Sequence, residues 1–450
     1  MKVAVAPAAP FLSARAGSAA EPGTGVVPGP GVGGRVRRAL NVAAVVLLAA
    51  CGGGGPTQIG NGSNGSVRGT INDNTGATVA NAAVQLTGNG QAARTANSGA
   101  DGVYTFADVP PGTYALTVTP PAGFGIGAAG PSITVAGGAQ ANAPTIVLNR
   151  MAVDPGKWGL RAQLIEANSE LAFAELNGKL YLLGGYPASR VTVPTVQVYN
   201  IASDSWQLGP PLPQPNNHGM AATVNGKIYL IGGQTTADDP SYVNTVYELD
   251  PAAGAWVAKA PMPTARSSGV AIVHDGKIYV AGGRPPRGND FAVFDPATNQ
   301  WEVLPELPSQ RNHLTGAAIN GRIHVAGGRL GNGLSPQMTT VHEVFDPQTR
   351  TWTTAAPMLR ARSGMNGVMA RGCFHVWGGE GPAGMFPDHD YYDPRTNQWT
   401  SLTNMPMPVH GVYGSAFMND LIWVPGGGTD IGGNHGSHHH QVYRPAVSCE

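Results

Sequence analysis

The sequence is short of charge, of cysteine and of long apolar runs, and each shortage argues against a class of protein. Charged residues make up 12% of the 450, and 27 basic side chains are balanced by 27 acidic ones, so no basic stripe is available to neutralise nucleic-acid phosphates. Three cysteines are too few for a disulfide framework, and none lies in a C-x-x-C pair. A nucleophile elbow, a phosphate-binding loop and an H-E-x-x-H motif are also missing from the sequence. We therefore expect no nucleic-acid partner and none of the enzymes that these motifs mark.

The longest apolar run, residues 39–50, is too short to span a bilayer in the usual way. A basic stretch precedes it, as in a secretory signal: Arg35, Arg37 and Arg38. The run ends in Leu48-Ala49-Ala50-Cys51, which resembles the lipobox of bacterial lipoproteins. That resemblance implies a lipid on Cys51 as the mature N-terminus, and Gly52 after it favours the outer membrane, facing the periplasm or the cell surface. The alternative is a short signal anchor with an incidental cysteine.

Composition divides the chain into four segments. Residues 1–51 are a low-complexity leader with the signal peptide, and residues 52–66 are a tether rich in glycine, serine and asparagine. Residues 67–150 show short alternating strands between turn residues. Their motifs Asp101-Gly102-x-Tyr104-x-Phe106 and Pro111-Gly112-x-Tyr114 resemble the carboxypeptidase regulatory-like domain, which implies a small, non-catalytic β-sandwich. Residues 151–450 are the fourth segment.

Glycine, by contrast, is plentiful, and in the fourth segment it recurs as a pair after an apolar run. The pairs recur at intervals of 45 to 51 residues and begin at Gly184, Gly232, Gly282, Gly327, Gly378 and Gly426. Tryptophans recur at nearly the same intervals: Trp158, Trp206, Trp256, Trp301, Trp352 and Trp399. A period near fifty with four short strands per unit is typical of a kelch β-propeller.

The same markers predict how the propeller closes. Trp158 precedes the first glycine pair, whereas no tryptophan follows the last pair, so the final unit lacks a fourth strand. We predict that a strand around Trp158 completes the final sheet, which leaves the ring without a free edge. The fold class is therefore all-β: a six-bladed kelch β-propeller preceded by a small β-sandwich.

One position in each unit is expected to ring the mouth of the central channel, on the face whose loops vary. Sixteen residues before each first glycine the sequence reads Asn168, Asn216, Arg266, Arg311, Arg362 and His410. Such a ring of donors suits carboxylates or sugar hydroxyls. Two residues further on, where His218 and His313 are further candidate ligand contacts, the series reads Glu170, His218, Ser268, His313, Gly364 and Val412. The alternative is that the arginines pair with neighbouring carbonyls and acids.

The last unit has a glycine-rich loop with clustered histidines, which we expect on the same face as His410. Imidazoles are common ligands of Zn and Cu, so His410, His435 and His438 are candidate metal ligands, although no cofactor is required by the sequence. The alternative is that the histidines are ordinary strand residues, as the equivalent positions of His342, His389 and His440 suggest.

Two cysteines fall in the propeller, and both are expected on its hairpin-turn face. Cys373 begins the second strand of the fifth unit, and Cys449 follows the last strand of the chain. In an oxidising compartment they could form a bridge that holds the C-terminus.

The repeats resemble those of bacterial kelch-repeat proteins, and the resemblance leaves three functions open. We favour an envelope-anchored module that binds a glycan or a protein and meets the membrane only through its lipid. The alternative is an envelope enzyme that acts on a small sugar, similar to the six-bladed sialic-acid mutarotases, whose acidic and arginine residues Glu170 and the three arginines could imitate. A galactose-oxidase-like copper site is disfavoured, because that family crosslinks a tyrosine to a cysteine and Cys373 and Cys449 are misplaced for it. A purely structural role is the third.

Overall fold

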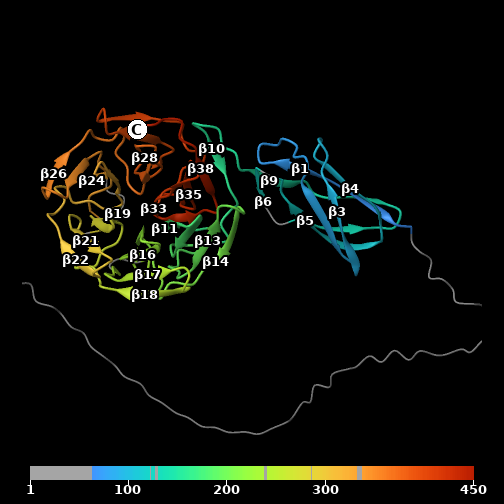
Figure 1. The fold of residues 1–450 in the computed structure, drawn as a ribbon, viewed down its shortest axis with the longest axis horizontal. Helices are drawn as coiled ribbons and strands as arrows, with labels where there is room; N and C mark the ends of the chain where they lie inside the picture. The colour runs from blue at the N-terminus through green and yellow to red at the C-terminus, as the bar shows by residue number, and fades with distance from the viewer. Residues whose placement is uncertain (1–62, 122, 127–129, 238–240, 285, 332–336) are drawn as a thin grey trace, which may run out of the picture. The chain divides into compact units, whose positions relative to one another are not determined.

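The computed structural model describes residues 63–450, except residues 122, 127–129, 238–240, 285 and 332–336 (Figure 1). The predicted signal peptide, the lipidation site Cys51 and most of the tether lie outside the described residues. Every regular element of the described residues is a β-strand. These residues contain no helix that is long and apolar enough to cross a membrane. The all-β fold class is confirmed.

The first part of the described chain is a sandwich of two sheets. One sheet has the order β4-β1-β9-β6, with β8 beside β1, and the other has the order β3-β2-β5-β7. The side chains of β1 alternate between buried and more exposed because one face packs on the opposite sheet. The strands are β1 (Gly65–Asp73), β2 (Ala83–Gly88), β3 (Gln91–Asn97), β4 (Val103–Val109), β5 (Gly112–Thr119), β6 (Phe124–Ile126), β7 (Ser132–Val135), β8 (Gln140–Asn142) and β9 (Ile146–Arg150).

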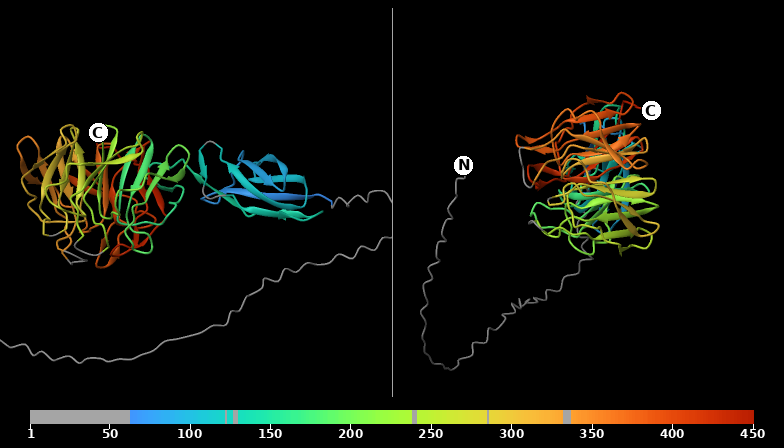
Figure 2. Two further views of the ribbon diagram at one scale, coloured as in Figure 1. Left: turned by 90° about the horizontal axis from the view of Figure 1, so that it is seen from below. Right: turned by 90° about the vertical axis from the view of Figure 1, so that its left-hand side faces the viewer.

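The second part is a ring of six sheets, the blades of a propeller, around a central axis (Figures 1 and 2). In blades two to five the first strand is innermost and the tryptophan strand outermost, and blade one has the same order with the short strand β33 added beside its first strand. Blades one to three are β11 (Leu171–Leu176), β12 (Lys179–Leu183), β13 (Val196–Asn200), β14 (Ser205–Leu208); β15 (Met220–Val224), β16 (Lys227–Ile231), β17 (Val246–Asp250), β18 (Ala255–Lys259); and β19 (Val270–His274), β20 (Lys277–Ala281), β21 (Phe291–Asp295), β22 (Gln300–Val303).

Blades four and five repeat this order, and blade six completes the ring. They are β23 (Thr315–Ile319), β24 (Arg322–Ala326), β25 (His342–Asp346), β26 (Thr351–Thr354); β27 (Asn366–Ala370), β28 (Cys373–Trp377), β31 (His389–Asp393), β32 (Gln398–Ser401); and, in blade six, β34 (Phe417–Met418), β35 (Leu421–Pro425), β38 (His440–Tyr443). Strand β33 (Val412–Gly414) precedes blade six in the chain but pairs in parallel with β11 of blade one. Two short hairpins stand outside the blades: β29 (Glu380–Gly381) with β30 (Gly384–Met385), and β36 (Gly428–Asp430) with β37 (Asn434–Gly436).

Strand β10 (Trp158–Leu160) closes the ring as predicted. It pairs antiparallel with β38, with Trp158 opposite Tyr443, so blade six is completed from the N-terminal side of the propeller. The C-terminus is held by a Cys373–Cys449 disulfide with a Cα–Cα distance of 5.0 Å, which confirms the predicted bridge.

The two-residue turns between first and second strands have the backbone that their sequences predict. Asn177 and Gly178, for example, both have positive φ, of 53° and 76°. Two consecutive left-handed residues make the turn whose twist matches an antiparallel pair, and asparagine and glycine adopt that conformation most readily. These turns define the hairpin-turn face of the propeller.

Candidate functional site

Six residues with left-handed backbone, one from each blade, form a closed belt of hydrogen bonds around the axis. Going round, the N–H of each donates to the carbonyl of the one before, at 2.7 to 3.0 Å, and Leu171 N–H closes the circle on Gly411 at 3.1 Å. The members are Glu170, His218, Ser268, His313, Gly364 and Gly411. The belt divides the axis into a loop side and a hairpin-turn side.

The belt corrects one register of the sequence analysis. The predicted series ended in Val412, whereas the structure places Gly411 in the belt. Blade six has one more residue between the belt and its glycine pair than the other blades, and there the chain forms two short strands, β33 beside β11 of blade one and β34 beside β35. The same shift puts Val409, not His410, at the end of the donor series: its carbonyl accepts from Gly379 N–H (2.9 Å), as that of Arg362 does from Gly328 N–H (3.0 Å).

The remaining five side chains of the predicted donor ring are buried and make hydrogen bonds within their own blades. All are at most 2% exposed, and each donates to the carbonyl of the first glycine of its own blade's pair, as Arg311 Nη1 does to Gly327 O at 2.8 Å. Arg311 and Arg362 also pair with the buried carboxylates of Glu343 and Asp390. Because these donors are already engaged, the geometry favours the structural alternative for them. Their ligand-binding role stays a prediction.

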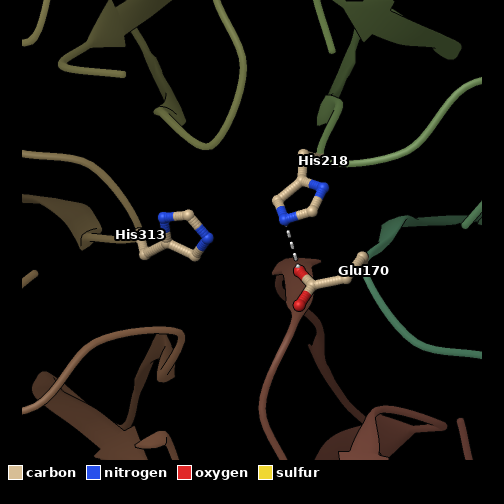
Figure 3. A group of neighbouring side chains, drawn as sticks. All are labelled: Glu170, His218 and His313. Atoms are coloured by element: carbon tan, nitrogen blue, oxygen red, sulfur yellow. Dashed lines mark ion pairs between the residues drawn. The ribbon is translucent and has the colours of Figure 1, made fainter. Parts of the chain in front are cut away.

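The loop side of the belt carries a buried polar cluster centred on Glu170 (Figure 3). Its carboxylate accepts from Tyr413 Oη at 2.8 Å and lies 3.0 Å from Nε2 of His218 and 3.1 Å from Nε2 of His410. His313 faces the same centre, and its ring lies 5.2 Å from that of His218. The structure thus brings together three of the predicted site residues, His218, His313 and His410.

Two asparagines fix the tautomers of His218 and His313. Oδ1 of Asn217 and Oδ1 of Asn312 each lie 2.5 Å from Nδ1 of the following histidine. The amides cannot turn over, because Nδ2 of Asn217 donates to the carbonyl of Thr236 and Nδ2 of Asn312 to that of Gly331. Nδ1 of each ring therefore carries the proton. Nε2 of His313 presents a lone pair to Arg329, whereas Nε2 of His218 lies between Arg284, which can only donate, and the Glu170 carboxylate, which can only accept.

Three charged members of the cluster were not predicted from the sequence. Nη2 of Arg284 lies 3.2 Å from Nε2 of His218, and Nη2 of Arg329 lies 3.0 Å from Nε2 of His313. Arg329 also donates to Glu380 Oε1 at 2.7 Å. All three directly follow a glycine pair, so aligning the units one residue beyond their pairs would have found them.

Burial and charge settle the protonation of most of the cluster. Desolvation would raise the pKa of Glu170, but its close contacts with His218 and His410 and the hydrogen bond from Tyr413 outweigh it, and the pKa lies below its usual range. Desolvation lowers the pKa of His218 to about 3 and that of His313 well below its usual value. Desolvation opposes protonation of His410 too, yet its contact with Glu170 and the charge of Glu380 raise its pKa.

The predicted metal ligands do not converge. The imidazole of His435 is 74% exposed beside Asp430, and Nδ1 of His438 donates to Leu164 O at 2.8 Å, while His410 is buried in the cluster. Among the described residues a different group, Glu170, His218 and His313, has ligand atoms within 4.8 Å of one another.

That group does not fit a metal ion in the described conformation. The two Nε2 lone pairs that would bind a cation already accept from arginine guanidiniums. A divalent ion at the centre would meet Arg284 and Arg329 at close range, a repulsion on the order of several kcal/mol for each, even at an effective dielectric constant near 20. We therefore derive no chemistry through a metal here.

On the hairpin-turn side of the belt the axis is hollow. A cavity of about 480 Å³ is lined by residues of the innermost strands and the residues beside them, and it reaches the last residues of those strands, such as Glu175, Thr223 and Val273. Its walls are mostly alanine, glycine and aliphatic side chains, and Glu175 is the one charged residue among the described residues that line it. Nδ2 of Asn366, a residue 7% exposed, has no hydrogen-bond partner within the described chain. The cavity therefore extends to the hairpin-turn face. The sequence predicted ligand contacts on the other face, which carries the variable loops.

Comparison with known proteins agrees with this architecture. The model of the KLHDC2/KLHL20/DRC7 Kelch-repeats domain matches residues 170–359, beginning at the first residue of the belt. The matched residues span blades one to four, which are therefore of the kelch-repeat type. The carboxypeptidase regulatory-like domain model matches residues 66–149, so the sandwich before the kelch domain is of that type.

A solved structure is similar in fold alone. The structure titled "Structure of YjhT" is 17% identical, with a TM-score of 0.53 over 62% of this chain and 95% of that chain. No curated protein matches the sequence.

Proposed function

We propose that this chain is an envelope-anchored binding protein whose kelch domain takes a glycan or a protein ligand, with an uncharged end group of that ligand entering the axial cavity. The cavity is the observation that carries the proposal. Its volume of about 480 Å³ falls in the range of roughly 300–1,000 Å³ that small-molecule sites occupy. Its nearly uncharged walls suit a neutral sugar or a short uncharged chain.

Binding is favoured over catalysis because the titratable groups on the axis are engaged with one another. Glu170, with its pKa below the usual range, is a weak proton acceptor near neutral pH. His218 and His313 are neutral, and their ring nitrogens are occupied by asparagine and arginine. A general base needs a pKa near the working pH and a free lone pair.

An envelope enzyme that acts on a small sugar is the second candidate, and His410 is the observation that favours it. Its pKa is raised, and it lies between two carboxylates, 3.1 Å from Glu170 and 3.7 Å from Glu380. A sialic-acid mutarotase-like reaction would need such a proton donor beside the channel. The pKa of Tyr413 is raised well above its usual value, so its hydroxyl stays protonated next to Glu170.

The anchor belongs to the proposal as well. We infer from the lipobox-like sequence that Cys51 carries a lipid in the outer membrane and that the tether and the sandwich space the kelch domain from it. Metabolic labelling with an azido fatty acid in a bacterial host should label the wild-type chain and not Cys51→Ala. Equal labelling of both, or membrane association that survives Cys51→Ala unchanged, would contradict the anchor.

The experiment for the kelch domain is a glycan-array screen with residues 66–450, combined with metal analysis. Selected ligands are then followed by nuclear magnetic resonance in the presence of the protein. The proposal expects a ligand that is bound and returned unchanged by protein free of Zn and Cu. Conversion of the ligand would favour the enzyme, and binding lost in His410→Ala but kept in His438→Ala would assign it to the axial cluster.

A further inference from the structure

The hairpin β36–β37 of blade six covers the loop-side mouth of the axis and binds it in the manner of a ligand. Its three-residue tip, 431–433, joins strands in which Gly428 pairs with Gly436 and Asp430 with Asn434. Gly432 N–H donates to Glu380 Oε2 at 2.7 Å, and Gly433 N–H donates to His410 Nε2 at 3.0 Å when that nitrogen carries no proton and so does not donate to Glu170. The carbonyl of Gly433 accepts from Ser169 Oγ at 3.2 Å.

These three hydrogen bonds use side chains from three different blades and only backbone atoms of the hairpin tip. Glu380, His410 and Ser169 are each at most 1% exposed. Main-chain recognition by buried polar side chains is what a peptide site provides. A buried carboxylate that accepts from a backbone N–H makes one of the stronger kinds of hydrogen bond.

The mouth also selects for glycine. Gly432 and Gly433 have φ of 76° and 73°, a conformation in which a side chain is strained. A Cβ on Gly433 would lie 3.0 Å from Glu170 Oε1, so even alanine would press on the centre of the cluster. Backbone conformation and space therefore demand the same residue.

We propose that the loop-side mouth is a peptide-binding site for a glycine-pair segment, which the blade-six hairpin fills in cis. An outside protein segment with two consecutive glycines in the left-handed conformation gains the same three hydrogen bonds when the hairpin lifts. The proposal deepens the protein-ligand arm of the proposed function, but it concerns the opposite end of the axis from the cavity.

The test removes the hairpin tip from the protein and adds the same segment back as a separate peptide. Residues 429–435 are replaced by Asn-Gly, a two-residue turn that joins the paired Gly428 and Gly436. The probe is an acetylated and amidated peptide of residues 429–435, and the control is the same peptide with Gly433→Ala. We expect the trimmed protein to bind the probe at least tenfold more tightly than it binds the control peptide. It should also bind the probe at least tenfold more tightly than the wild-type protein does. Glu380→Gln in the trimmed protein should weaken the probe at least tenfold.

The proposal is overturned if trimmed protein with a native circular dichroism spectrum binds both peptides equally or neither. It is also overturned if methyl glycosides bind the emptied mouth and the probe does not. Should the trimmed protein not fold, full-length Gly433→Ala replaces it, since the added Cβ presses on Glu170 and is strained at this φ, which weakens the binding of the tip. If that variant binds the probe no better than the wild type does, the site is refuted. Val273→Trp, which narrows the cavity at the other end, should leave probe binding unchanged, so the two proposals fail separately.

Discussion

Some polar side chains of this propeller stabilise the fold, although their residue type suggests ligand binding. Arg311 is buried, donates to two carbonyls and pairs with Glu343. Arg311→Met should therefore lower the free energy of unfolding by about 3–5 kcal/mol, because it leaves a buried carboxylate without its partner. Urea unfolding measures this, and the double variant Arg311→Met, Glu343→Leu should recover part of the loss. Wild-type stability of Arg311→Met together with lost ligand binding would show that the arginine serves the ligand.

Buried neutral histidines predict how stability depends on pH. His440 packs against Tyr199 and Trp206, with ring centroids 4.5 and 5.3 Å away, and desolvation lowers its pKa to about 3. In the unfolded chain His440 binds a proton as the pH falls through about 6.5, whereas in the folded chain it stays neutral until the pH approaches 3. His440 thus costs no stability above about pH 6.5 and progressively more as the pH falls toward 3, with a slope of about 1.4 kcal/mol per pH unit.

His440→Phe should remove one proton from this slope while filling the same aromatic space. Calorimetry or urea unfolding between pH 7 and 4 compares the variant with the wild type. His435→Phe is the control, because its side chain is 74% exposed. Parallel pH profiles for His440→Phe and the wild type would contradict the account.

At the scale of elements, the ends of the propeller are secured twice, by strand β10 and by the Cys373–Cys449 bridge across a sequence separation of 76 residues. Such a loop corresponds to a stabilisation on the order of 4 kcal/mol in the chain-entropy model. Cys449→Ser should lower the free energy of unfolding by about 2–4 kcal/mol. In protein that starts at residue 66 these are the only cysteines. Alkylation without reductant should label neither of them, and two labelled thiols would contradict the bridge.

Repeat spacing predicted the elements well because each blade repeats the same local chemistry. Glycine pairs, tryptophans and Asn-Gly turns located the blades, and the unmatched Trp158 predicted the closing strand. The candidate site was harder to predict. A fixed offset of sixteen residues could not register the extra residue of blade six, so His410 was placed one position off. Arg284, Arg329 and Glu380 lie one residue beyond their glycine pairs, a position that the sixteen-residue offset did not sample.

At the scale of the whole propeller, the two ends of the axis differ. The belt from Glu170 to Gly411 separates a closed, polar loop side from an open cavity on the hairpin-turn side. The cavity needs no rearrangement to receive a ligand, whereas the loop-side mouth is filled by the chain itself. A binding protein with a preformed cavity is therefore the central claim.

Titration calorimetry of an array-selected ligand against a matched pair of tryptophan variants tests that claim most directly. Val273 lines the cavity and is 38% exposed, whereas Val303 lies on outer strand β22, is 66% exposed and does not line it. Val273→Trp should weaken binding at least tenfold with an unchanged unfolding temperature, and Val303→Trp should bind like the wild type. Unchanged affinity in Val273→Trp, or equal loss in both variants, would contradict binding in the axial cavity.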